Sequence, residues 1–171
     1  MRASTLFVLV LIGCGRETAA GPGDLLAEWT GHTAGSFQAR LSATHCPTTG
    51  IVELLAVRGD TGIGGAVFLR DSTTVSAGDY PIFLAATYPE PRPGALAALR
   101  WFNVTAITAY EGLRGRIRLE PDDDSTLAGS FDVVVQGLEH PDTLKLTGRF
   151  TRVPLVRADT GCARTMRRNT L

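Results

Sequence analysis

The sequence predicts an all-β fold, an antiparallel sandwich or barrel of about eight to nine strands. From Leu25 onward, apolar and polar residues alternate within short segments, as they do when one face of a strand covers a core. Gly, Asp, Ser and Pro residues separate these segments at short intervals and indicate turns. No segment shows convincing helical periodicity over three turns, so the pattern favours strands.

The alternation is clearest in residues 36–43, 116–120 and 144–151. The other expected strands are 25–30, 51–58, 63–70, 80–86, 96–110 and 126–136, and turns are expected at 59–62, 76–79, 111–112, 122–125 and 139–142. One alternative stays open in the middle of the chain. The Ala- and Leu-rich half of residues 89–99 could form a turn of helix after a Pro-rich loop.

A four-residue pattern recurs in three of the expected strands. Residues 34–37, 128–131 and 147–150 each read small-Gly-polar-Phe. Because Gly and Phe are two positions apart, they face the same side of a strand. A glycine weakens a strand unless the sheet bends or another group approaches closely, so the pattern indicates a strongly curved or closed sheet.

Composition excludes two broad classes of protein. The chain has 171 residues with 44% hydrophobic and 20% charged residues, which is typical of a globular domain and not of a disordered chain. Lys and Arg number 17 against 17 Asp and Glu. Without a basic excess to neutralise phosphates, we expect no nucleic-acid partner.

The first residues have the features of an export signal. Arg2 precedes the unbroken apolar run 6–12, which is shorter than the roughly 20 residues that a membrane-spanning helix needs. The run ends in Leu11-Ile12-Gly13-Cys14. This segment resembles the lipobox of bacterial lipoproteins, an aliphatic residue, a small or aliphatic residue, Gly, Ala or Ser, and then Cys.

The lipobox resemblance implies a lipid anchor at Cys14. In that family the cysteine thiol receives a diacylglycerol, a dedicated peptidase cuts before it, and the new N-terminus is usually acylated, for which we expect palmitate. We therefore expect a signal peptide at 1–13, a flexible tether at 14–24, a β domain at 25–163 and a C-terminal tail at 164–171. The protein would be exported to the cell envelope, with the outer membrane favoured by Gly15 after the cysteine.

The cysteine count predicts one disulfide. If lipidation uses Cys14, then Cys46 and Cys162 remain as an even pair in an oxidising compartment, and we expect them to bond to each other. The alternative is a metal pair that includes His45. No second His or Cys lies at zinc-like spacing, so the disulfide is favoured.

No catalytic motif appears in the sequence, and we expect a protein without enzymatic activity and without a cofactor or metal. The three histidines, His32, His45 and His140, lie in or beside expected loops and far apart. The acidic run 122–124 could attract Ca²⁺, but it falls at an expected hairpin turn without the spacing of a calcium loop. Residues 58–60 spell Arg-Gly-Asp, which a hairpin corner explains better than adhesion.

Trp29 and the late Arg149 or Arg152 give a weak resemblance to lipocalins. In that family an early Gly-x-Trp packs against a late arginine and closes an eight-stranded barrel around an apolar ligand. Here Ala27 replaces the glycine, and no C-terminal helix is expected. The leading expectation is a lipid-anchored, non-catalytic β domain with a structural or binding role and a protein or apolar partner. The alternative is a lipocalin-like carrier of an apolar small molecule.

Overall fold

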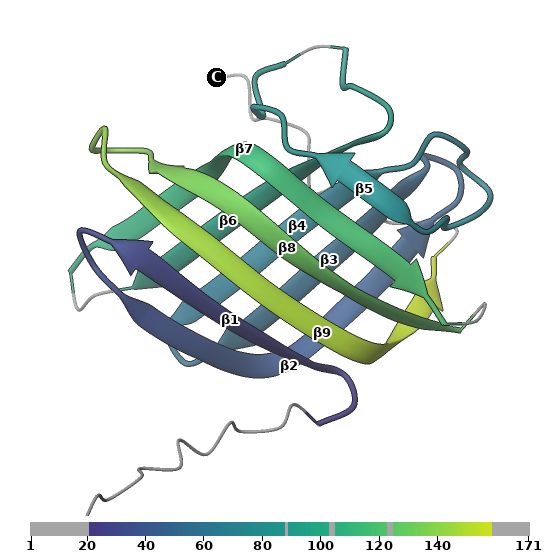
Figure 1. Ribbon diagram of the computed structural model, residues 1–171, viewed down its shortest axis with the longest axis horizontal. Helices are drawn as coiled ribbons and strands as arrows, with labels where there is room; N and C mark the ends of the chain where they lie inside the picture. The colour runs from purple at the N-terminus through teal and green to yellow at the C-terminus, as the bar shows by residue number, and fades with distance from the viewer. Residues whose placement is uncertain (1–20, 88, 103–104, 123–124, 159–171) are drawn as a thin grey trace, which may run out of the picture.

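The computed structural model describes residues 21–158, except 88, 103–104 and 123–124, and it confirms an all-β fold (Figure 1). The strands are β1 Asp24–Gly31, β2 Gly35–Cys46, β3 Ile51–Arg58, β4 Thr61–Phe68, β5 Gly78–Pro81, β6 Gly94–Phe102, β7 Ile107–Pro121, β8 Thr126–Gly137 and β9 Thr143–Arg157. Eight of them form a closed antiparallel barrel. Of the two architectures that the sequence predicted, the protein therefore adopts the barrel and not the sandwich.

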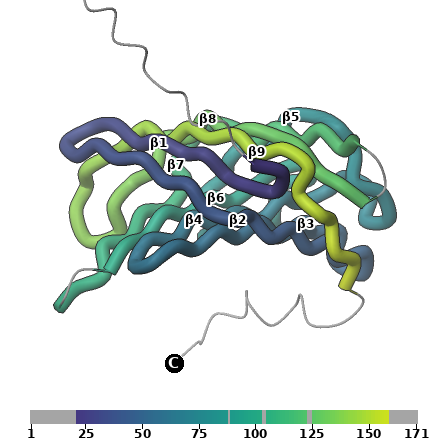
Figure 2. The backbone as a smooth tube through the Cα atoms, turned by 90° about the horizontal axis from the view of Figure 1, so that it is seen from below, coloured from purple at the N-terminus to yellow at the C-terminus, as the bar shows by residue number. Residues whose placement is uncertain are grey.

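The barrel strands follow one another in chain order, and only β5 lies outside that order. Closure comes from β9, which pairs antiparallel with β1 and then, past the start of β1, parallel with β2. This pairing satisfies backbone groups that β1 and β2 would otherwise leave at an open sheet edge. Figure 2 shows the barrel flattened into two layers, with β1, β7, β8 and β9 above β2, β3, β4 and β6.

β5 fills a gap in the barrel wall. β6 and β7 are paired only between Ala98 and Phe102 on β6, and beyond that point they separate. There β5 pairs with residues 116–119 of β7, while Ile82 makes an isolated parallel bridge to Ala95. Tyr80 of β5 is 3% exposed and belongs to the core. The expected strand 80–86 was therefore too long, because its pairing with β7 ends at Pro81.

The expected strand 96–110 and the turn at 111–112 were wrong. Strand β6 ends at Phe102, and β7 runs without interruption from Ile107 to Pro121, with Glu111 and Gly112 inside it. A register shift between Gly112 and Arg114 marks a bulge there. Gly112 is needed for close packing, since a Cβ at this position would lie 2.9 Å from Cγ2 of Ile82.

The Ala- and Leu-rich segment 95–99 lies in β6, so the helix alternative was also wrong. This segment pairs along its whole length with β4, and Ala95 and Leu99 face the core with no exposed area. Ala and Leu favour helices in isolation, but here they form a strand because β6 is buried between β4 and β7.

The alternation in the sequence assigned the inward face correctly. The buried residues in the three clearest segments are Phe37, Leu41, Ala43, Ile117, Leu119, Leu144, Leu146 and Phe150. Together with side chains from all the remaining barrel strands, they form a single core inside the barrel. Period-two burial on every strand is what a closed sheet with one interior requires.

The recurring Gly-x-Phe pattern forms reciprocal contacts between β8 and β9. Gly129 lies opposite Phe150, and Phe131 lies opposite Gly148. Each ring occupies the space above the opposite glycine, so that a Cβ at Gly129 would lie 2.6 Å from Cζ of Phe150, and one at Gly148 would clash with Phe131. Gly35 makes room for the indole of Trp29 in the same way. The pattern therefore lets an aromatic ring of one strand approach the backbone of the next strand closely, one of the two reasons expected for glycine in these strands.

We predict that Gly148→Ala destabilises the protein by about 1–3 kcal/mol, because its Cβ would displace the Phe131 ring inside a packed core. The measurement is the free energy of unfolding in urea. Gly64→Ala is the matched control, since its Cβ would meet no atom closer than 3.7 Å. A second substitution, Phe131→Ala, should reduce the cost of Gly148→Ala, and equal costs in both backgrounds would contradict the contact.

Candidate functional site

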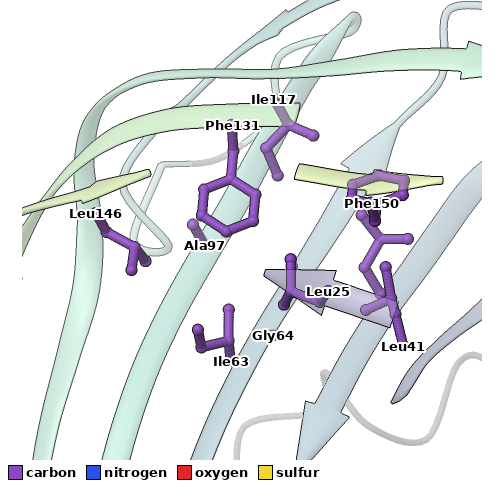
Figure 3. Close-up of a pocket in the computed structure, with 11 residues that line it drawn as sticks. Leu25, Leu41, Ile63, Gly64, Ala97, Ile117, Phe131, Leu146 and Phe150 are labelled. Atoms are coloured by element: carbon purple, nitrogen blue, oxygen red, sulfur yellow. The ribbon is translucent and has the colours of Figure 1, made fainter. Parts of the chain in front are cut away.

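The barrel interior is a packed core. Figure 3 shows apolar side chains from several strands meeting there, among them Leu25, Leu41, Ile63, Ile117 and Phe150. The space between them is about 20 Å³. That is enough for about one water molecule, but an apolar lining gives water no partners, so the space stays dry. Sites for small-molecule ligands are typically about 300–1,000 Å³, so the interior as it stands holds no such ligand.

The contact expected from the lipocalin resemblance does not form. Trp29 lies on the inward face of β1, whereas Arg149 and Arg152 are both exposed. Arg149 lies between the inward-facing Gly148 and Phe150 of β9. The indole of Trp29 stacks instead on that of Trp101, with ring centroids 5.8 Å apart. Strand parity separates Trp29 and Arg149, because neighbouring residues of a strand point to opposite faces.

Aromatic rings close one end of the barrel. Trp101 lies between Trp29 and Tyr110, with 5.3 Å between the ring centroids of Trp101 and Tyr110. The ring of His32 stacks on Tyr110 at 6.4 Å. These residues come from the turns and strand ends at the β1–β2 and β6–β7 connections. They separate the apolar core from solvent at that end.

Asp142 connects the polar groups of this aromatic end. The hydroxyl of Tyr110 donates to Oδ2 of Asp142 at 2.8 Å, and Nδ1 of His32 lies 3.0 Å from the same oxygen. Burial, followed by the bond to Asp142 and its negative charge, raises the pKa of Tyr110 to about 12. The two contacts of Asp142 connect the β1–β2 turn, β7 and the β8–β9 turn at this end of the barrel.

The other histidines lie elsewhere. His140 is exposed in the turn between β8 and β9, as expected. His45 was expected in or beside a loop as an exposed residue, but it is 5% exposed at the end of β2, and its Nε2 lies 3.0 Å from the carbonyl of Ser72. Its burial follows from the segment 69–75, which folds over the end of β2. Within the described ranges, no three His, Cys, Asp or Glu side chains gather as metal ligands.

Two tripeptides with potential chemistry were expected at hairpin turns. Residues 58–60 form the corner between β3 and β4, where Gly59 has a φ of 58°. Asp122 is exposed in the β7–β8 hairpin, and its amide donates to the carbonyl of Thr126 at 3.2 Å. Asp123 and Asp124 lie outside the described residues. Both hairpins are where the turn signals in the sequence indicated them.

Cys46 is fully buried and disulfide-bonded. The chain has two other cysteines, Cys14 and Cys162, and both lie outside the described residues. The pairing of Cys46 with Cys162 and the lipidation of Cys14 therefore stay predictions.

A hollow of about 290 Å³ lies on the outer wall of the barrel, across β3, β4, β6 and β7. Gly64, Ala66, Leu96 and Ala98 contribute its outward-facing floor, and the carboxylates of Glu53 and Glu111 lie on its two outer strands. The strand register makes the floor continuous, since Gly64 pairs with Ala98 and Ala66 with Leu96. Side chains this small leave room for a ligand where an ordinary strand surface would be filled.

The segment that follows β5 walls the hollow through Ala85, and Arg92 anchors this segment. The guanidinium of Arg92 donates to the carbonyls of Thr49, Gly50 and Leu69 at 2.9–3.3 Å. It also lies 5.6 Å from the ring centroid of Phe68. The Pro-rich connection therefore has fixed attachments at this end of the barrel.

The sequence analysis did not identify the hollow or the bonds of Asp142. The residues of the hollow span positions 53–112 and meet only through the register of four strands. Two signals were present: Glu53 interrupts an apolar strand, and residues 64–66 read Gly-Gly-Ala within another. Tyr110 and Asp142 lie 32 positions apart, and no local pattern joins them.

Comparison with protein-family models, with curated proteins and with solved structures found no match for this chain. In the part of the chain that the structure describes, no helix is long and apolar enough to cross a membrane.

We predict that Tyr110 makes folding sensitive to alkali. Between about pH 10 and pH 12 the unfolded chain loses the Tyr110 proton while the folded protein keeps it, so stability falls as pH rises. The free energy of unfolding should fall by about 2–3 kcal/mol over this range, and this fall should be absent in Tyr110→Phe. Urea unfolding across this range measures it. Tyr80→Phe is the matched control, and an unchanged alkaline loss in Tyr110→Phe would contradict the assignment.

We predict that Cys46→Ser and Cys162→Ser each destabilise the domain by about 4–5 kcal/mol, because the disulfide would close a loop of more than 100 residues. The double variant should lose no more than either single variant, since both remove one bond. Urea unfolding and non-reducing peptide mapping test this, with Cys14→Ser as the control. A free thiol at Cys162 in the folded protein would rule out the pairing.

Proposed function

We propose that this protein is a lipid-anchored envelope lipoprotein whose barrel has a non-catalytic, binding role exercised through its outer surface. The sequence Leu11-Ile12-Gly13-Cys14 after a short apolar run supports export and lipidation at Cys14. The segment 14–24 would then tether the barrel close to a membrane. We favour the outer membrane, because the residue after the cysteine is glycine.

The disulfide bond of Cys46 supports an oxidising compartment. Structural disulfides are rare in the reducing cytosol, and a buried one fits a domain that folds after export. The proposal requires Cys162 to be the partner of Cys46, because a bond to Cys14 would leave that thiol unavailable for lipidation.

The observation that carries the binding role is the filled interior. The interior space that the described residues leave is about 20 Å³ and dry, whereas the hollow on the outer wall is more than ten times larger. A carrier of the lipocalin type needs an interior of ligand size, so the packed core removes the main support for that alternative.

Lipidation is tested by expressing the full chain in a bacterial host with labelled palmitate and separating membranes from soluble protein. We predict a labelled, membrane-bound product whose mature N-terminus is a lipid-modified Cys14 in mass spectrometry. Cys14→Ser should lose the label, while Cys162→Ser should keep it. An unmodified mature chain that begins at another residue would overturn the proposal.

A further inference from the structure

We propose that the outer hollow between Glu53 and Glu111 binds a small aliphatic dication, a linear molecule with an amine at each end. This deepens the binding role proposed above by naming the ligand class. Three properties of the hollow support it: its size, its two carboxylates without cationic partners, and its floor of small apolar side chains.

The carboxylates of Glu53 and Glu111 are free to take a ligand's charge. Both residues are half-buried on outward-facing positions, and among the described residues neither makes an ion pair or a side-chain hydrogen bond. No basic residue lines the hollow. Half-buried carboxylates without partners favour a cation that replaces some of their lost hydration.

The register of the strands spaces the two charges apart. Glu53 pairs with Ala66 on β4, and Glu111 pairs with Ala98 on β6. β3 and β7 are three strand spacings apart, and Ala66 pairs with Leu96, two residues before Ala98, so the backbone positions of the two glutamates are separated by roughly 16 Å. One compact cation cannot neutralise both groups, whereas an extended molecule with a charge at each end can.

The floor between the charges suits an unbranched alkyl chain. Gly64, Ala66 and Ala98 have no side chain beyond Cβ, so a chain can lie close to the backbone there and bury apolar surface against the larger side chain of Leu96. Among the described residues that line the hollow there is no aromatic ring, and this favours an unbranched amine over a bulky quaternary ammonium group. At about 290 Å³ the hollow is at the lower end of the range for ligand sites, which favours a small molecule.

The test is calorimetric titration of the purified full chain in detergent with cadaverine and spermidine. Pentylamine is the comparison ligand, since it matches cadaverine except for one amine. We expect saturable one-to-one binding of the diamines and at least fivefold weaker binding of pentylamine. Glu53→Gln and Glu111→Gln should each weaken the binding of cadaverine about five- to tenfold. The double variant should bind cadaverine no more tightly than it binds pentylamine.

Two further variants separate binding from folding. Glu28→Gln removes an exposed carboxylate on β1 and should leave the affinity for cadaverine unchanged. Ala98→Leu should fill the hollow and abolish binding of every amine while the urea midpoint stays at the wild-type value, because Ala98 is exposed.

The proposal is overturned if no diamine binds saturably, if pentylamine binds as tightly as cadaverine, or if the two glutamine variants bind like the wild type. Binding of a basic peptide without binding of diamines would also overturn it. Because the probes are added to purified protein, a failure here is distinguishable from a failure of the anchoring test, which is read in cells.

Discussion

The pairing of aromatic rings with glycines across neighbouring strands is the constraint on which the rest of this structure depends. Phe131 lies over Gly148 and Phe150 over Gly129, so two large rings fit side by side inside the barrel. If these positions carried side chains, β8 and β9 could not approach while both rings pointed inward. The flattened, closed sheet and its filled interior both follow from this arrangement.

A filled interior determines where function can lie. The rings of Phe131 and Phe150 line the remaining interior space, and Trp29, Trp101 and Tyr110 close one end. Barrels that carry ligands leave the interior open, and this one uses the same architecture to build a compact core. We therefore propose that recognition takes place on the outer wall, where strand faces usually interact only with solvent.

Small residues act in opposite ways on the two faces of the sheet. On the inner face, Gly129 and Gly148 are covered by rings and contribute to packing. On the outer face, Gly64, Ala66 and Ala98 leave a hollow between two carboxylates, walled by the Arg92-anchored segment. The same residue types thus give close packing where a neighbour supplies a ring and an open site where none does.

The sequence by itself determined the all-β class, most strand positions and the inward face of the three clearest segments, because period-two alternation is a local property. It also indicated a curved or closed sheet through the Gly-x-Phe segments, and it contains the segment 11–14 that resembles a lipobox. Only the tertiary structure decided that the sheet closes, that β7 continues through Glu111 and Gly112, and that Glu53 and Glu111 share one hollow. Such features depend on register between strands far apart in the chain, which no local pattern encodes.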